Sequence, residues 1–273
     1  MLDGYGCRVL ISRGIVRGDA NMATAAIPRA RTRTHFFSRS ALLMLAMVLA
    51  SFPATYFVPV LIGSGRFAPI FHIHGIAFFA WIGLYAWQTH LIASGRVARH
   101  RELGLWGFAL SGLMVGLGWA LAIAAIQRRI ANGEAHPFDN ALYNIVDITS
   151  FTILMAASIA SVTRHIDWHR RFTLAAAVAL VGPAISRWFY ATPLPPLPPF
   201  TDFAPNIIAD LFLVALAVHD RRTLGRIHPV TLICLIVMVP IHLLTPFAVS
   251  SAWWRAIAPG LLTITHVAPG MAG

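Results

Sequence analysis

The chain has 273 residues, of which 58% are hydrophobic and only 11% are charged. This composition is too apolar for an ordinary soluble domain and indicates a multi-pass membrane protein. The formal net charge of +11 would suit a soluble nucleic-acid-binding protein, but membrane topology explains the arginines better, so we expect no nucleic-acid partner.

Apolar segments long enough to cross a bilayer recur along the chain, since a helix needs roughly 20 residues to span about 30 Å of hydrocarbon. We expect an all-α polytopic bundle of about seven transmembrane spans, with the sixth the shortest. The expected spans cover about residues 41–61, 68–92, 104–126, 142–162, 172–191, 204–218 and 229–249. The expected organisation is a disordered Arg-rich tail (1–40), a transmembrane domain (41–250) and a short C-terminal tail (251–273).

The arginines are distributed unevenly between the loops of this topology. If the N-terminus is cytoplasmic, the outer segments carry only Arg66, Arg128, Arg129 and Arg255. All other arginines outside the spans then lie on the cytoplasmic side. The positive-inside rule therefore predicts that the N-terminus is inside and the C-terminus outside. The expected location is a bacterial inner membrane.

Several spans carry polar side chains near the predicted outer face. Ionisable groups in a span are costly, and they usually mark a functional site or a tight pair. Arg187 is expected to pair with Asp147 or Asp210. The whole outer cluster is either a clamp between helices, a site for a ligand, haem or metal, or a proton path. Its expected members are His72, His74, Asn144, Asp147, Arg187, Asn206, Asp210 and His242.

A second set of polar residues lies toward the predicted cytoplasmic face, and it includes His90, His100 and His169. His72 and His90 are separated by five helical turns, about 27 Å along the axis, so both are expected on one face of their span. His72 is expected to point inward. Axial histidines in two layers are typical of two-haem membrane cytochromes.

Short motifs between residues 72 and 187 repeat a family pattern. They are His72-x-His74, Gln88, Arg96, His100-Arg101 before Leu103-Gly104, His169-Arg170 and Arg187. This series resembles the DUF2306 family of bacterial multi-pass membrane proteins, which has no established function.

The helical layout also resembles cytochrome b561-type bundles. That resemblance implies an inner haem b held by His100 and His169. An outer haem is in doubt, because Asn144 and Asp147 stand where it would need a histidine, unless His242 substitutes.

The leading hypothesis is a haem-binding electron-transfer protein, in which the outer cluster binds a quinone or a small polar ligand. The candidate cofactor residues are His72, His74, His90, His100, His169 and His242. The alternative is a transporter or ligand-binding protein that uses Asn144, Asp147, Arg187, Asn206 and Asp210.

Other readings of the same residues stay open. A zinc hydrolase on His72, His74 and His242 is disfavoured, because histidines two apart in a helix point about 200° apart. A structural subunit is also possible. No dedicated metal site and no catalytic residue are predicted. Gly112 and Gly116 are expected to form a seam for close helix packing.

Overall fold

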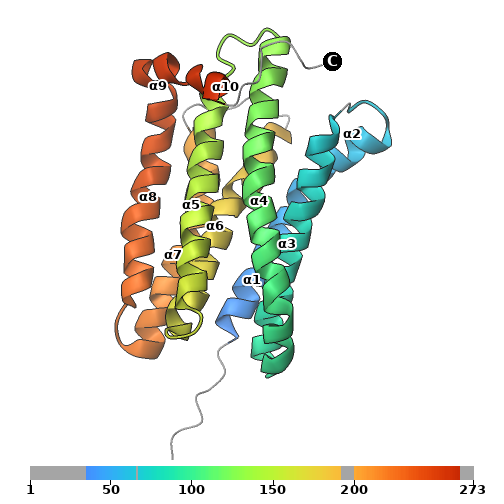
Figure 1. The fold of residues 1–273 in the computed structure, drawn as a ribbon. Helices are drawn as coiled ribbons and strands as arrows, with labels where there is room; N and C mark the ends of the chain where they lie inside the picture. The colour runs from blue at the N-terminus through green and yellow to red at the C-terminus, as the bar shows by residue number, and fades with distance from the viewer. Residues whose placement is uncertain (1–34, 66, 192–199, 265–273) are drawn as a thin grey trace, which may run out of the picture. The chain divides into compact units, whose positions relative to one another are not determined.

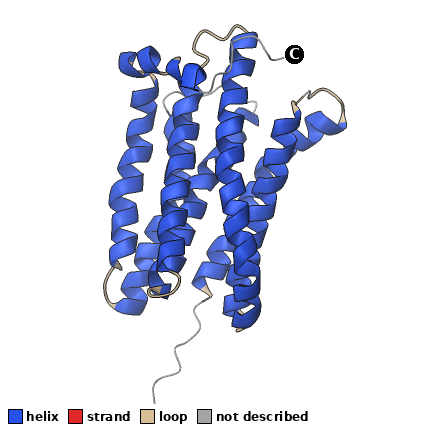
Figure 2. Ribbon diagram, viewed as in Figure 1, coloured by secondary structure: helices blue, strands red, loops and turns tan. Residues whose placement is uncertain are grey.

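The computed structural model describes residues 35–65, 67–191 and 200–264, which belong to a compact unit that begins at Thr34. Regular secondary structure within these ranges is entirely helical (Figure 2). The elements are α1 (Phe36–Ser51), the π-helical turn η1 (Pro53–Phe57), α2 (Val58–Leu61), α3 (Pro69–Ala93), α4 (Val97–Ala131), α5 (Asp139–Ser161), α6 (Ile166–Ala191), α7 (Phe200–Leu224), α8 (Pro229–Val249), α9 (Ala252–Ile257) and α10 (Gly260–Ile264).

Among the described residues, 7 helical segments are long and apolar enough to cross a membrane, with α1, η1 and α2 together forming the first. This confirms the predicted all-helical chain with seven candidate spans. The boundaries differ in places. The first span begins at Phe36 rather than residue 41, and α7 runs from Phe200 to Leu224 rather than over 204–218. Helical backbone continues beyond the apolar segment in both cases, and hydropathy marks only that segment.

The chain ends adjoining the spans also depart from the prediction. Part of the expected C-terminal tail forms α9 and α10. Of the expected N-terminal tail, residues 1–34 lie outside the described residues.

Local capping signals explain where several helices begin and end. Proline stands at the first position of α3 and α8, where a missing backbone N–H costs nothing. Gly95, with φ 82°, follows α3. The backbone N–H of Arg96 donates to the Leu91 carbonyl (2.8 Å), and that of Gly95 donates to the Ile92 carbonyl (3.1 Å). This pair of hydrogen bonds forms a Schellman motif, so the chain reverses immediately into α4.

Loops gather at two opposite ends of the helices in Figure 1. One end carries α2, α9 and α10 and is termed the α9 end. The other carries residues 94–96, 162–165 and 225–228 and is termed the loop end.

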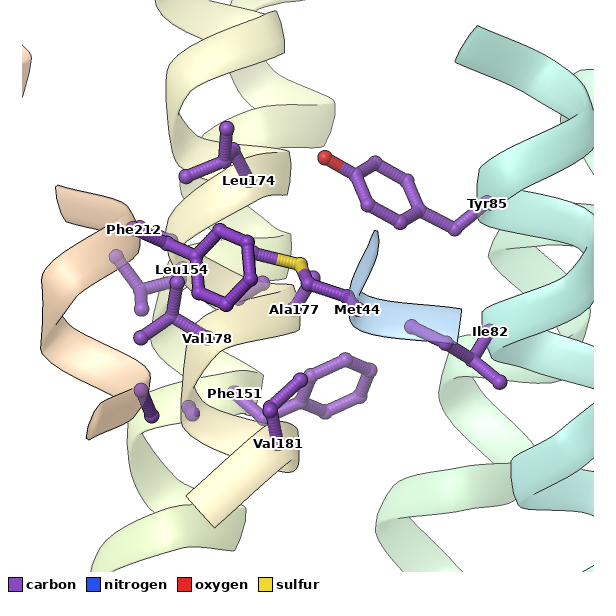
Figure 3. Packing of buried hydrophobic residues seen from close by; sticks show 14 of the residues in the cluster. Met44, Ile82, Tyr85, Phe151, Leu154, Leu174, Ala177, Val178, Val181 and Phe212 are labelled. Carbon is purple, nitrogen blue, oxygen red and sulfur yellow. The ribbon is translucent and has the colours of Figure 1, made fainter. Parts of the chain in front are cut away.

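Helix α6 lies at the centre of the packing, in contact with α1, α5, α7 and α8. Its run from Leu174 to Val178 is completely buried and consists largely of alanine. Small side chains let neighbouring backbones approach closely, which is how membrane helices associate without a hydrophobic driving force. Larger side chains such as Met44, Ile82 and Phe151 fill the space around α6 (Figure 3).

Close glycine contacts occur elsewhere than predicted. A Cβ placed at Gly112 or Gly116 would meet no atom within 4 Å, so the expected α4 seam is wrong. The tight positions are Gly118, where a Cβ would lie 3.0 Å from Ile148, and Gly182, where it would collide with the Asn206 side chain.

Candidate functional site

Polar side chains inside the bundle form separate groups around α6, not a single outer cluster and a set of inner histidines. One group surrounds a cavity between α3, α4, α5 and α6 at the loop end, termed the His100–His169 cavity. A second surrounds a cavity between η1, α3, α4 and α6 at the α9 end, termed the Arg187 cavity. A third group links α5, α7 and α8.

The His100–His169 cavity has a volume of about 210 Å³ and a mainly apolar lining. His100 comes from the first turn of α4, and His169 from the first turn of α6. The imidazoles are close enough for a charge on His169 to act on His100. The structure therefore brings together the two histidines that the cytochrome b561 resemblance pairs. The lining residues are Trp81, Leu84, Tyr85, Gln88, His100, Arg101, Gly104, Leu105, Gly107, Phe108, Met155, Val162, His169 and Thr173.

Ser158 of α5 fixes the orientation of the His169 ring. The His169 Nδ1 lies 2.8 Å from the Ser158 hydroxyl and 3.1 Å from the Ser158 carbonyl oxygen. If Nδ1 carries the proton, it donates to that carbonyl and leaves Nε2 as the lone-pair nitrogen. Histidine ligands to metals are usually held in this way, through a hydrogen bond on the other ring nitrogen.

Among the residues that the structure describes, buried polar atoms without hydrogen-bond partners concentrate on this cavity. They are the hydroxyl of Tyr85, both amide atoms of Gln88 and Nδ1 of His100. Figure 3 shows Tyr85 reaching from α3 across to the neighbourhood of Leu174 on α6. Buried polar groups normally find partners, and unpaired ones are expensive, so such a concentration is typical of a binding site.

The Arg187 cavity is larger, at about 400 Å³, and combines aromatic with basic side chains. Its lining residues are Phe52, Thr55, Tyr56, Phe67, Phe71, His74, Gly75, Phe78, Leu121, Ala125, Arg128, Arg129, Glu134, Pro183, Ala184 and Arg187. Tyr56 also meets His72, with 2.5 Å between its hydroxyl and Nδ1.

The histidine of "FHIHG" that lines this cavity is His74, not His72 as expected. His72 is half-buried and contacts Tyr56 of η1. The expectation that His72 and His90 share an inward face is also wrong, because His90 is exposed and stacks on Trp87, one turn away. His72 and His90 of α3 therefore do not line one inward face.

A buried acid–histidine pair joins α7 to α8. The His242 Nδ1 lies 2.9 Å from both carboxylate oxygens of Asp210, and Asp147 of α5 is close enough for its charge to act on His242. Within the described ranges, the His242 Nε2 is buried without a partner. Asn206, one turn before Asp210, packs against Gly182 of α6. Asn144 is half-buried one turn before Asp147.

Arg187 does not pair with either aspartate as predicted. Its Nη1 donates to the Thr55 hydroxyl (3.4 Å), and its guanidinium carbon lies 4.3 Å from the centre of the Phe52 ring. Among the described residues it forms no ion pair. Arg187 thus contacts η1 and the preceding Phe52, whereas Asp210 bonds His242 of α8.

The zinc hypothesis also requires three histidines to converge, and they do not. His72 contacts Tyr56, His74 lines the Arg187 cavity, and His242 bonds Asp210. Across the described residues, no group of three or more His, Cys, Asp or Glu side chains is placed to hold a metal ion.

Sequence reasoning missed the most buried charged pair, Arg171 with Asp220. Both residues adjoin Arg-rich loops, where charges are expected to be exposed. The available signal was an acidic residue next to basic ones at the end of an apolar span, "AVHDRR".

Comparison with known proteins adds no relative. No family model, no curated protein and no solved structure matches the chain. The resemblance to the DUF2306 family stays a prediction from its motif residues.

Proposed function

We propose that this protein is a polytopic membrane protein that binds haem b in the His100–His169 cavity and uses it for electron transfer. The observation that carries the proposal is that two imidazoles from different helices line one apolar cavity, and Ser158 holds one of them at Nδ1. Two neutral imidazoles are a usual axial ligand pair for haem in membrane cytochromes.

The lining chemistry fits such a group. The walls are mostly apolar, as a porphyrin face requires. A Cβ added at Gly104 would meet no atom within 4 Å, which leaves room for a ligand against α4. Arg101 belongs to the same lining and carries a charge that suits a propionate. When bound, haem would supply one-electron chemistry, while the chain would supply the ligands, their orientation and an apolar surrounding that tunes the potential.

The predicted topology places this cavity near the cytoplasmic face. The loop end carries the Arg-rich connections, so the positive-inside rule assigns it to the cytoplasm of a bacterial inner membrane. The exposed apolar side chains of the seven helices would then face lipid. Electrons would enter or leave from the cytoplasmic side, and a quinone dissolved in the bilayer is a suitable partner.

The test is to purify the protein in detergent from haem-replete cells and record its reduced-minus-oxidised absorption spectrum. The wild type is expected to show a b-type spectrum, and His100→Ala and His169→Ala are each expected to lose it. His90→Ala is the matched control, because His90 is exposed and lies outside the cavity lining. A wild type without a Soret band, or a spectrum that survives both substitutions, rules out the proposal.

A second candidate function, proton-coupled transport, is favoured by the Asp210–His242 pair. Both residues are buried, and their hydrogen bond links α7 to α8. A second carboxylate, that of Asp147, lies near the pair. Carboxylates and histidines inside a bundle commonly relay protons. In proteoliposomes containing a pH-sensitive dye, Asp210→Asn should abolish any proton flux that the wild type supports. A flux unchanged by Asp210→Asn, or none in the wild type, removes this candidate.

A further inference from the structure

The Arg187 cavity contains a cation without a carboxylate partner. Within the described ranges, the only group that accepts a hydrogen bond from the Arg187 guanidinium is the Thr55 hydroxyl, and the Nε atom is buried without a partner. Arg187 is half-buried, and a charge held partly out of water without a counter-charge is costly. Such a cost is rarely retained unless a ligand of opposite charge offsets it.

Two contacts hold the guanidinium in place. Its central carbon lies over the Phe52 ring, 4.3 Å from the ring centre, and Nη1 donates to the Thr55 hydroxyl. These contacts leave the Nε and Nη2 donors available to bind a ligand. Two parallel N–H groups on one edge match the two oxygens of a carboxylate or a phosphate.

The other charges of the lining do not neutralise Arg187. Glu134 is bonded to Arg129, at 3.0 Å. Arg128 adds a further positive charge and lies over the Phe71 ring, 5.7 Å from its centre. Three arginines thus face one carboxylate in this cavity.

His74 contributes a hydrogen-bonding imidazole to the same lining. Its Nδ1 is buried and unpartnered among the described residues, and its ring stacks on Phe78. The remaining walls are largely aromatic and come from η1 and the start of α3. The cavity therefore offers charge and hydrogen bonds from α6 and α3, beside surfaces suited to an apolar group.

We propose that the Arg187 cavity binds an oxyanion carried on an apolar body, with the Arg187 guanidinium edge as the main contact and the Thr55 hydroxyl and His74 as additional partners. The anionic group is a carboxylate or a phosphate. Its source is either a small amphipathic molecule or the headgroup of an anionic lipid. The site is independent of the haem proposal, because no residue lines both cavities.

Two binding measurements distinguish the sources. Benzoate and inorganic phosphate are titrated into detergent-purified protein by calorimetry, with thermal unfolding as a second readout. Separately, the protein is placed in nanodiscs of phosphatidylcholine with or without phosphatidylglycerol, and co-purifying lipid is measured. Binding of benzoate or phosphate supports a free oxyanion ligand, and selective retention of phosphatidylglycerol supports a lipid headgroup. Absence of all three overturns the proposal.

Variants tie the binding to the guanidinium. Arg187→Gln should weaken whichever interaction is seen by at least tenfold, and Arg187→Lys should retain part of it through its charge. Arg255→Gln is the matched control, since Arg255 is an exposed arginine of α9 at the same end that pairs with Asp139 (3.4 Å). If Arg187→Gln does not fold, the Thr55→Val and His74→Phe variants provide the test, with a several-fold loss expected. Binding that is unchanged in every cavity variant that folds overturns the proposal.

Discussion

Arg171 of α6 and Asp220 of α7 form a bidentate ion pair in the interior of the bundle at the loop end. The Arg171 Nε donates to one carboxylate oxygen of Asp220 at 3.1 Å, and Nη2 donates to the other. The Thr231 hydroxyl (2.5 Å) and the His228 backbone N–H (3.3 Å) also donate to this carboxylate. A single acidic group thus joins α6, α7 and the beginning of α8.

Breaking this pair should destabilise the protein strongly. Asp220→Asn leaves Arg171, which is 1% exposed, with only the more distant and exposed Asp167 carboxylate (4.0 Å) as a counter-charge. Loss of one partner of a buried pair typically costs about 3–5 kcal/mol. Unfolding in increasing SDS, followed by circular dichroism, should show that loss. Arg222→Ala, an exposed arginine next to the pair in sequence, should change stability by about 0.5 kcal/mol or less. Equal effects of the two substitutions would contradict the assignment.

The ion pair between Arg171 and Asp220 could not be predicted from hydropathy and charge counts. The helical class and the approximate spans follow from composition alone, because roughly 20 consecutive apolar residues have few alternatives to a membrane helix. Arg171 looks like one more positive charge of a basic loop until the rotation of α6 about its axis is known. That rotation is set by packing against neighbouring helices, which one sequence does not encode in a visible pattern.

Replacing Gly182 with alanine should destabilise the contact between α6 and α7. The added Cβ would collide with the Asn206 side-chain oxygen, so the Asn206 amide must turn away. We expect a cost at the lower end of the about 1–3 kcal/mol that is typical of overpacking. Combining Gly182→Ala with Asn206→Ala should recover part of the loss, measured as the coupling energy of a double-mutant cycle in SDS unfolding.

Gly112→Ala is the matched control for this substitution. A Cβ there meets no atom within 4 Å, and alanine is a better helix former than glycine. The variant should be neutral or slightly stabilising. A loss as large as that of Gly182→Ala would mean that the α6–α7 contact is not the cause.

The candidate sites were predictable in part. The residue types were identifiable because polar groups in apolar spans are rare. The resemblance to cytochrome b561-type bundles predicts that His100 and His169 lie together, and both line one cavity. The division of the expected outer cluster was not predictable. Arg187 faces η1, whereas Asp210 and His242 meet on the other side of α6. The depth of a residue can be read from its position in a span, but its direction depends on helix rotation.

Substitution of Ser158 tests the support of the proposed haem ligand. Ser158→Ala removes the hydroxyl that contacts the His169 Nδ1 (2.8 Å) and the Thr173 hydroxyl (2.7 Å), but it keeps the backbone carbonyl. Haem retention should fall by roughly tenfold, within the range typical for outer partners of metal ligands. Pyridine haemochrome quantification measures it. The Ser161 hydroxyl donates to the Ala157 carbonyl of its own helix, so Ser161→Ala should retain haem fully.

Stability should depend on pH through His228, which lies between α7 and α8. Its Nδ1 accepts a hydrogen bond from the Val230 N–H (3.2 Å) and caps α8, which requires the unprotonated ring. Burial, and then the positive charge of Arg171, lower the pKa of His228 in the folded protein. Below the ordinary histidine value of about 6.5, the unfolded chain therefore binds a proton that the folded chain does not.

The stabilising contribution of His228 is consequently complete above pH of about 6.5 and is lost as the pH falls toward the lower folded pKa. His228→Asn keeps a capping acceptor without a titrating group. As the pH falls through this interval, the melting temperature of the wild type should decrease relative to that of the variant. A difference that stays constant from neutral to acidic pH would show that the cap does not titrate.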